Sequence, residues 1–246
     1  MKKFLILQLR ADDEVADNEF HAMLRMGGLT EDEVHRVRIE HNGIPDDINP
    51  QDYAGIIVGG GPTCVSTPKE DQSPEQLKFD ADLFKLSDVV YAHDIPYMGA
   101  CYGIGILAAH QGACVSKEKY SEEVGPTHVY KTEAGAQDIL LRDLPDDFYA
   151  LCGHQEACQE VPESATLLLT SDVCPVQMFR IKENIYATQF HPELDYESIC
   201  LRIDFYKHAG YFKPEDAEHV KAHCATQDIV YPAHILKAFV SRYRTH

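Results

Sequence analysis

One cysteine of this sequence stands in a setting that could make it a nucleophile. Cys101 lies at the centre of a Gly-x-Cys-x-Gly tract, residues 99–103, which directly follows a short apolar run. In such a tract a strand turns sharply into a helix, and the flanking glycines let the backbones pack closely while the central side chain stands exposed. The pattern predicts a nucleophile elbow. The alternative is a buried, inert cysteine in a glycine-rich turn.

A base and an acid that could orient it follow further along the chain. His191 and Glu193 belong to the tract Gln-Phe-His-Pro-Glu, residues 189–193. Residues two apart in an extended segment point to the same side, so Glu193 could hold one ring nitrogen of His191 while the other faces Cys101. This arrangement favours a thiolate–imidazolium pair, because each charge stabilises the other. A lone histidine in a loop could instead be structural or exposed to solvent.

A second glycine-rich tract, Gly-Gly-Gly-Pro at 59–62, ends the apolar run 55–58. It lacks the Gly-Lys-Ser/Thr of a phosphate-binding loop, so it does not indicate a nucleotide site. The backbone N–H groups of Gly61 and Tyr102 could instead hold a developing oxyanion beside Cys101. A simple tight turn is the alternative interpretation.

The elements that must position these residues alternate between strand and helix. Apolar runs at 4–9, 55–58 and 96–98 are typical of strands buried on both faces, and the Ser-Pro pair at 73–74 indicates a helix start. From about residue 127, shorter strand-like segments predict an antiparallel portion. We expect an α/β fold with an open, mixed but mostly parallel sheet, flanked by helices on both faces as in a flavodoxin-like core.

We predict a single domain over residues 1–246, with 196–246 as a helical C-terminal extension, because we find no linker or repeat. Apolar residues within 231–243 recur at helical spacing, which predicts a helix that packs against the sheet or across a homodimer interface. His219 and His223 lie one helical turn apart but lack a metal-binding spacing such as His-Glu-x-x-His. We therefore predict neither a metal nor a cofactor.

Composition restricts the partners that this chain could have. The chain has 246 residues and a formal net charge of −18, so it should repel nucleic acid and anionic membranes. No apolar stretch approaches the roughly 20 residues of a membrane span. None of the eight cysteines forms a Cys-x-x-Cys pair, and free cysteines fit a reducing, cytoplasmic location.

The three tracts together resemble those of class I glutamine amidotransferases. Their order and spacing are similar over residues 1 to about 195, and the chain most resembles stand-alone members related to the amidotransferase domain of GMP synthase. In that family a cysteine attacks the side-chain amide of glutamine, ammonia leaves, and water releases glutamate from a γ-glutamyl thioester. The resemblance implies the same fold and chemistry here.

Individual roles follow from the resemblance, position by position. It implies Cys101 as the nucleophile, His191 as the general base and acid, and Glu193 as the residue that orients His191. It also implies that Gly61 and Tyr102 form the oxyanion hole.

Two positions depart from the family pattern. Many members have Gln where this chain has Gly105, and that Gln lines the glutamine pocket. The tract that binds the amino-acid end of the substrate has its counterpart in Gly-His-Gln-Glu, residues 153–156. Glu156 could pair with an α-ammonium group, whereas His154 could equally be a hydrogen-bonded structural histidine. The predicted substrate-binding residues are Gly60, Gly153, His154 and Gln155.

Three functions remain open from the sequence. The first is a glutaminase whose ammonia a separate synthetase subunit would use, because the chain has no Ser-Gly-Gly-x-Asp-Ser tract of a synthetase. The second is a hydrolase of other γ-glutamyl compounds, for which Gly105 leaves room. The third is a catalytically idle binding or regulatory protein, and the intact triad of cysteine, histidine and glutamate argues against it.

Overall fold

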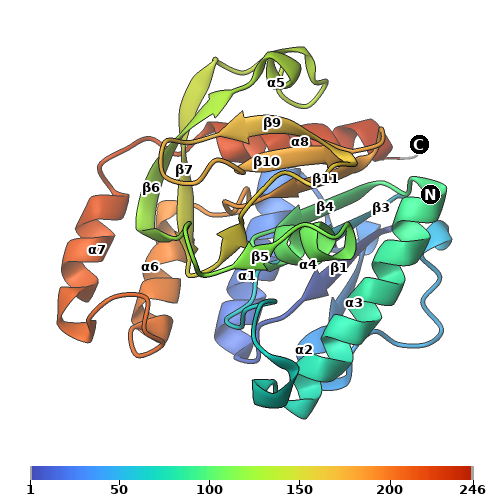
Figure 1. Ribbon diagram of the computed structural model, residues 1–246, viewed down its shortest axis with the longest axis horizontal. Helices are drawn as coiled ribbons and strands as arrows, with labels where there is room; N and C mark the ends of the chain where they lie inside the picture. Colours follow the sequence, from blue (N-terminus) through green and yellow to red (C-terminus); the bar gives the residue numbers. More distant parts are fainter. Residues whose placement is uncertain (1, 245–246) are drawn as a thin grey trace.

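A computed structural model describes residues 2–244, and within this range a nine-stranded sheet crosses the molecule in the order β2-β1-β3-β4-β11-β10-β9-β6-β7 (Figure 1). Its strands, in chain order, are β1 (Phe4–Gln8), β2 (Val34–Arg38), β3 (Gly55–Val58), β4 (Tyr97–Ala100), β6 (Glu122–Lys131), β7 (Asp147–His154), β9 (Ala165–Thr170), β10 (Met178–Ile181) and β11 (Ile185–Thr188). A small second sheet pairs β5 (Val115–Ser116) with β8 (Ala157–Cys158).

The sheet has a parallel and an antiparallel part. The neighbouring strands β2, β1, β3, β4 and β11 pair in parallel, with Ile57 opposite Met98 where β3 meets β4. From β11 onward each pair is antiparallel, through β10, β9, β6 and β7. The structure thus confirms the predicted α/β fold with a mixed, mostly parallel sheet.

Helices cover both faces of this sheet. They are α1 (Asp13–Gly27), α2 (Ile39–Asn42), α3 (Pro74–His93), α4 (Tyr102–His110), α5 (Glu133–Gln137), α6 (Tyr196–Tyr206), α7 (Ala217–Cys224) and α8 (Tyr231–Tyr243). Short 3-10 turns occupy Glu31–Glu33, Pro50–Asp52, Lys69–Asp71 and Pro214–Asp216. Among the described residues, no helix is both long and apolar enough to cross a membrane.

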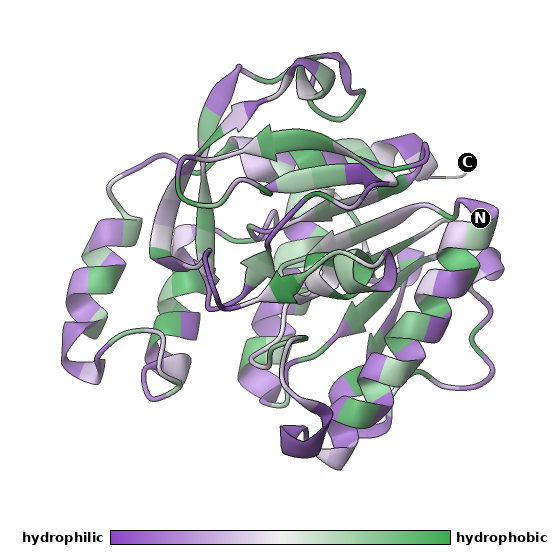
Figure 2. Ribbon diagram, in the orientation of Figure 1, coloured by the Kyte–Doolittle hydropathy of each residue, from purple (hydrophilic) through white to green (hydrophobic). Residues whose placement is uncertain are grey.

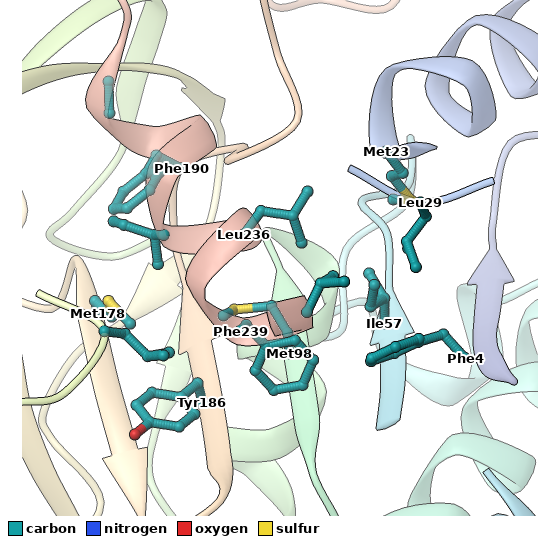
Figure 3. Close-up of a cluster of buried hydrophobic side chains, with 14 of the residues drawn as sticks. Phe4, Met23, Leu29, Ile57, Met98, Met178, Tyr186, Phe190, Leu236 and Phe239 are labelled. Carbon is teal, nitrogen blue, oxygen red and sulfur yellow. The ribbon is translucent and has the colours of Figure 1, made fainter. Parts of the chain in front are cut away.

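Two apolar clusters hold the layers together. On one face, α1 and α8 pack on the sheet, and Phe239 of α8 lies against Phe4 and Tyr186 (Figure 3). On the other face, α3 and α4 bury residues such as Leu83 and Ile104. In Figure 2 strands such as β9 and β10 are mainly hydrophobic, whereas β6 is largely hydrophilic, and α3 and α7 alternate between hydrophobic and hydrophilic residues. Burial on both faces explains the near-continuous apolar runs of the parallel strands.

Local signals account for most helix boundaries. Ser73 caps α3 as expected, because its hydroxyl accepts from the N–H of Gln76. Helix α1 begins at Asp13, because the side chain of Asp12 accepts from the N–H of Val15 and caps the helix. The segment predicted at 231–243 becomes α8, which packs against α1 and the sheet of its own chain.

Candidate active site

The predicted elbow forms at the carboxyl end of β4. Cys101 adopts a φ of 52°, in the left-handed region that residues with a side chain rarely occupy, and α4 begins at the next residue. A Cβ placed on Gly99 would lie 2.8 Å from the carbonyl carbon of Gly103, so Gly99 tolerates no bulkier replacement. The N–H of Cys101 donates to Thr188 O at 2.8 Å, which ties the elbow to β11.

The two backbone donors predicted for an oxyanion hole lie beside this thiol. Gly61 and Tyr102 line one pocket together with Cys101. Within the described residues neither N–H donates to a protein acceptor, and Tyr102 is the first residue of α4, where no intrahelical acceptor exists. Both N–H groups are therefore free to bind an anionic oxygen.

His191 and Glu193 form a buried hydrogen-bonded pair. Nδ1 of His191 lies 2.9 Å from Oε1 of Glu193, and Arg202 of α6 donates to the same oxygen at 3.0 Å. Nη1 of Arg202 also lies 3.2 Å from Nδ1, but the shorter contact is to Glu193, which when ionised can only accept, so we assign the proton to Nδ1 and leave Nε2 as the acceptor. Among the described residues no hydrogen bond joins Cys101 to His191, although both line one pocket. Contacts of this kind commonly tighten only in the complex with substrate.

Burial sets the protonation states of this pair. It raises the pKa of the Cys101 thiol to about 12, an effect that the nearby charge of Arg10 reduces only in part. Burial also lowers the pKa of His191, although Glu193 acts in the opposite sense. These directions favour a neutral thiol beside a neutral imidazole, in place of the thiolate–imidazolium pair expected from the sequence.

A chain of buried charges extends from this pair toward α1. Arg202 lies 3.5 Å from Oε1 of Glu19, and Arg10, just beyond the end of β1, donates to the same oxygen at 2.7 Å. Burial opposes the ionisation of Glu193, but His191 and Arg202 hold its pKa well below the usual range. Arg202 is thus a positioning residue that stabilises the carboxylate behind His191.

Sequence reasoning missed Arg10, Glu19 and Arg202. A signal exists for two of them, since each interrupts the buried face of an amphipathic helix. Glu19 follows Ala16 on the inner face of α1, and Arg202 lies beside Ile203 on that of α6. A charged residue on such a face is buried only when it is paired.

In the tract 153–156, His154 is held by hydrogen bonds to other groups of the protein. Nε2 of His154 lies 2.8 Å from Oε2 of Glu122, and its Nδ1 lies 2.8 Å from the backbone oxygen of Glu156, as in the structural interpretation of this histidine. Glu122, Cys152 and His154 cluster closely enough to suggest metal ligands. However, Glu122 also accepts from Thr127 and from Gln177, so protein donors already occupy both its oxygens.

The space left by Gly105 is occupied by other residues. A Cβ on Gly105 would lie 3.1 Å from Cγ2 of Val65 and 3.8 Å from Oε1 of Glu156. The carboxylate of Glu156 accepts from the N–H groups of Val65 and Ser66 at 2.7 and 2.8 Å. Val65 and Glu156 therefore fill the region into which a Gln side chain at position 105 would extend.

The remaining predicted binding residues do not all reach the same place. Gly153 and Gln155 line a pocket with Cys101, as does His154. Gly60 faces His191 instead, since a Cβ there would collide with Cε1 of that ring. The substrate-binding role of Gly60 stays a prediction, while its place in the structure is to let the imidazole approach.

Two pockets meet at the thiol. Cys101, Gly61, Gly153 and Tyr211 belong to both. The polar pocket is otherwise lined by Thr63, Cys64, Tyr102, Gly105, Val115, His154, Gln155, Glu156, Ala157, Cys158 and Gln189. The apolar pocket is otherwise lined by Arg10, Pro62, Val124, Cys152, His191, Leu194, Ile199, Arg202, Ile203, Tyr206 and Phe212.

Comparison with known proteins agrees with this geometry. The sequence matches the model of the family "Glutamine amidotransferase class-I" over residues 14–198, which is most of the chain. The chain belongs to the class I glutamine amidotransferase family. The elbow, the histidine tract and the two pockets all draw residues from this matched range.

Relatives of this amidotransferase chain differ in length. GMP synthase [glutamine-hydrolyzing] of Bacillus pumilus is 30% identical over 158 residues, which are 63% of this chain but only 27% of that relative. The chain thus spans about a quarter of that protein. A separate subunit of the GMP synthase [glutamine-hydrolyzing] of Methanococcus maripaludis is 26% identical over 195 residues, 72% of this chain and 92% of the relative.

Solved structures share the fold of this amidotransferase. A glutamine amidotransferase of Thermotoga maritima has a TM-score of 0.73 at 20% identity, covering 99% of this chain and 98% of that one. A second from Methylobacillus flagellatus has a TM-score of 0.70 at 17% identity, with coverages of 99% and 94%. These similarities support the fold alone, including the helices that follow residue 195.

Proposed function

We propose that this chain hydrolyses the side-chain amide of glutamine to glutamate and ammonia through a thioester on Cys101. The observation that carries the proposal is the elbow at Cys101. Cys101 shares one pocket with two unpaired backbone N–H groups, and another with a histidine that a buried carboxylate orients. These are the parts that acyl transfer through a covalent intermediate requires.

The proposed reaction has two stages, formation of the thioester and its hydrolysis, and His191 transfers a proton in each. Nε2 of His191 takes the thiol proton as the sulfur of Cys101 attacks the amide carbon. The carbonyl oxygen becomes negative and binds the N–H groups of Gly61 and Tyr102. The C–N bond then breaks, and His191 returns the proton to the departing ammonia. A water molecule, deprotonated by His191, releases glutamate from the thioester while Glu193 holds the imidazole.

The polar pocket suits the glutamyl half of the substrate. It contains the predicted oxyanion donors, the amide of Gln155 and the carboxylate of Glu156. Glu156 is fixed by two backbone donors, so its negative charge is held in one place and could pair with the α-ammonium group of glutamine.

A synthetase partner is part of the same proposal. The relatives named above are GMP synthases, and the archaeal relative is one subunit of such an enzyme. We infer that a separate synthetase protein binds this chain and uses the ammonia that it releases.

The test is glutamate release from glutamine by the wild-type chain and by Cys101→Ala. We expect the variant to lose about 10³-fold or more in kcat, because removing a nucleophile abolishes the covalent route. Cys114→Ala is the matched control, since this cysteine is exposed and lines neither pocket. A diazoketone analogue of glutamine should label Cys101. Glutamate release that survives in Cys101→Ala, or an unlabelled Cys101, would reject the proposal.

A further inference from the structure

The apolar pocket is larger and more hydrophobic than release of ammonia requires. Its cavity has a volume of about 60 Å³, which is room for several water molecules. Beyond the residues around Cys101, its wall consists largely of apolar and aromatic side chains: Val124, Leu194, Ile199, Ile203, Tyr206, Tyr211 and Phe212. Ammonia has no apolar surface to bury against such a wall, so the wall fits a larger leaving group.

The position of His191 decides which half of a substrate enters this pocket. His191 lines the apolar pocket and not the polar one, whereas Tyr102 and Gly105 line only the polar one. In amide hydrolysis the general acid must lie beside the departing nitrogen. With the acyl carbon at Cys101, the amine therefore leaves into the apolar pocket and the glutamyl chain extends into the polar one.

Two arginines give the lining of the apolar pocket a positive charge. Arg10 and Arg202 belong to its lining, whereas their ion-pair partners Glu19 and Glu193 do not. Nε of Arg10 donates to Glu19, and Nη1 donates to the hydroxyl of Tyr206 at 3.3 Å. Within the described residues Nη2 of Arg10 donates no hydrogen bond, so it can receive an anion from the pocket.

We propose that the preferred substrates are γ-glutamyl amino acids whose amino-acid half is apolar. The side chain of that half lies against the wall formed by Ile203 and Phe212, and its α-carboxylate binds Arg10. This inference rests on the proposed thioester chemistry at Cys101, and it makes an amino acid, in place of the ammonia that a synthetase would use, the preferred leaving group. Attack by sulfur breaks the C–N bond, His191 gives its proton to the nitrogen, the free amino acid departs, and water then releases glutamate.

The experiment compares three substrates on the purified full-length chain. They are glutamine, γ-glutamyl-leucine, and the γ-glutamyl amide of isoamylamine, which is γ-glutamyl-leucine without its carboxylate. We expect kcat/KM for γ-glutamyl-leucine to exceed that for glutamine about tenfold or more, the scale on which a hydrophobic pocket discriminates. It should exceed that of the isoamylamide about tenfold, the effect of one charge-assisted hydrogen bond. Removing the carboxylate from the substrate leaves Arg10 and its bond to Glu19 intact.

A variant of the wall provides a second test. Ile203→Ala should lower the ratio of kcat/KM for γ-glutamyl-leucine to that for glutamine about threefold to tenfold. The matched control is Val173→Ala, because Val173 is apolar, 57% exposed and part of neither pocket. The control should keep the wild-type ratio.

The outcomes separate this inference from the proposed function. If Cys101-dependent hydrolysis of glutamine is faster than that of γ-glutamyl-leucine, the leaving-group inference is wrong and the glutaminase proposal stands. Equal values of kcat/KM for γ-glutamyl-leucine and the isoamylamide would show that Arg10 does not bind the α-carboxylate of the substrate. If no substrate is hydrolysed and the diazoketone leaves Cys101 unlabelled, both proposals fail together.

Discussion

The two pockets that meet at Cys101 are built by different parts of the chain. The polar pocket is made by the elbow, the loop after β3 and the turn between β7 and β8. Most of the apolar wall comes from α6 and the segment that follows it, including Tyr211 and Phe212. In Figure 1, α6 and α7 stand to one side of the sheet, next to β6 and β7. One thiol thus serves two surfaces of different chemistry.

The two surfaces are also held in different ways. In the polar pocket, backbone N–H groups fix the carboxylate of Glu156. Beside the apolar pocket, side chains of opposite charge hold one another, from Arg10 through Glu19 and Arg202 to Glu193. The first arrangement depends on the loop after β3 and the turn between β7 and β8, and the second on the packing of α1 against α6.

The largest expected effect concerns the thiol where the pockets meet. Because the pKa of Cys101 is raised to about 12, the thiolate fraction should rise tenfold with each pH unit below that value. Alkylation of Cys101 by iodoacetamide, followed by peptide mass spectrometry, should accelerate about 1000-fold from pH 6 to pH 9. A rate that is constant over this range would indicate the thiolate–imidazolium pair. Exposed Cys114 reports on the reagent in the same sample.

The charged network should dominate the stability of the apolar side. Arg202→Met leaves the carboxylate of Glu193 buried without its cation, and we expect it to lower the free energy of unfolding by about 3–5 kcal/mol. Urea-induced unfolding measures this loss. The control is Arg25→Met, whose partner Asp195 is partly exposed, and it should cost less than about 1 kcal/mol. Similar losses for both variants would contradict the role of the network.

Arg202 should also affect the pH dependence of activity. Its charge lowers the pKa of His191, so Arg202→Met removes a factor that keeps this imidazole neutral. The pKa of His191 rises in the variant, and the acidic limb of the profile of kcat/KM moves to higher pH. A merely structural arginine would leave that limb in place.

On the polar side, Glu156→Gln should weaken substrate binding. The amide nitrogen cannot accept from Val65 or Ser66, and the charge offered to an α-ammonium group is lost. We expect KM for glutamine to rise about tenfold to a hundredfold, the effect of one or two charge-assisted bonds. Glu160→Gln removes an exposed carboxylate from the same part of the chain and should leave KM unchanged. Equal KM values for the two variants would dismiss the role of Glu156.

The smallest effect is expected at Gly105. Gly105→Ala gains about 1 kcal/mol of helix propensity, but its Cβ would press on Val65, so we expect stability to change by less than about 1 kcal/mol. Because Val65 helps to hold Glu156, KM should rise only a few-fold. A thermal melt and steady-state kinetics check both values. If Gly105→Ala did not fold, the expectation would be wrong, because Val65 could not move to accommodate the added Cβ.

Much of the site could be predicted from the sequence because its signals are local. The turn at Cys101 needs a strand, two glycines and a helix start within a few residues, and the spacing of His191 and Glu193 depends only on extended backbone. The apolar runs of the parallel strands likewise follow from burial on both faces. The start of α1 depends on a single side chain, that of Asp12, which caps the helix.

The residues that only the tertiary structure revealed act across long distances in the sequence. Arg10 and Arg202 meet at Glu19 because β1, α1 and α6 pack together, and no local pattern encodes that meeting. The protonation state of Cys101 was likewise decided by burial, which spacing cannot report. The sequence by itself determined the α/β class, and it predicted the residues that we propose as nucleophile and base, Cys101 and His191. The packing of α6 and the following segment decided which chemistry surrounds them, because a pocket is formed by surfaces that meet only after folding.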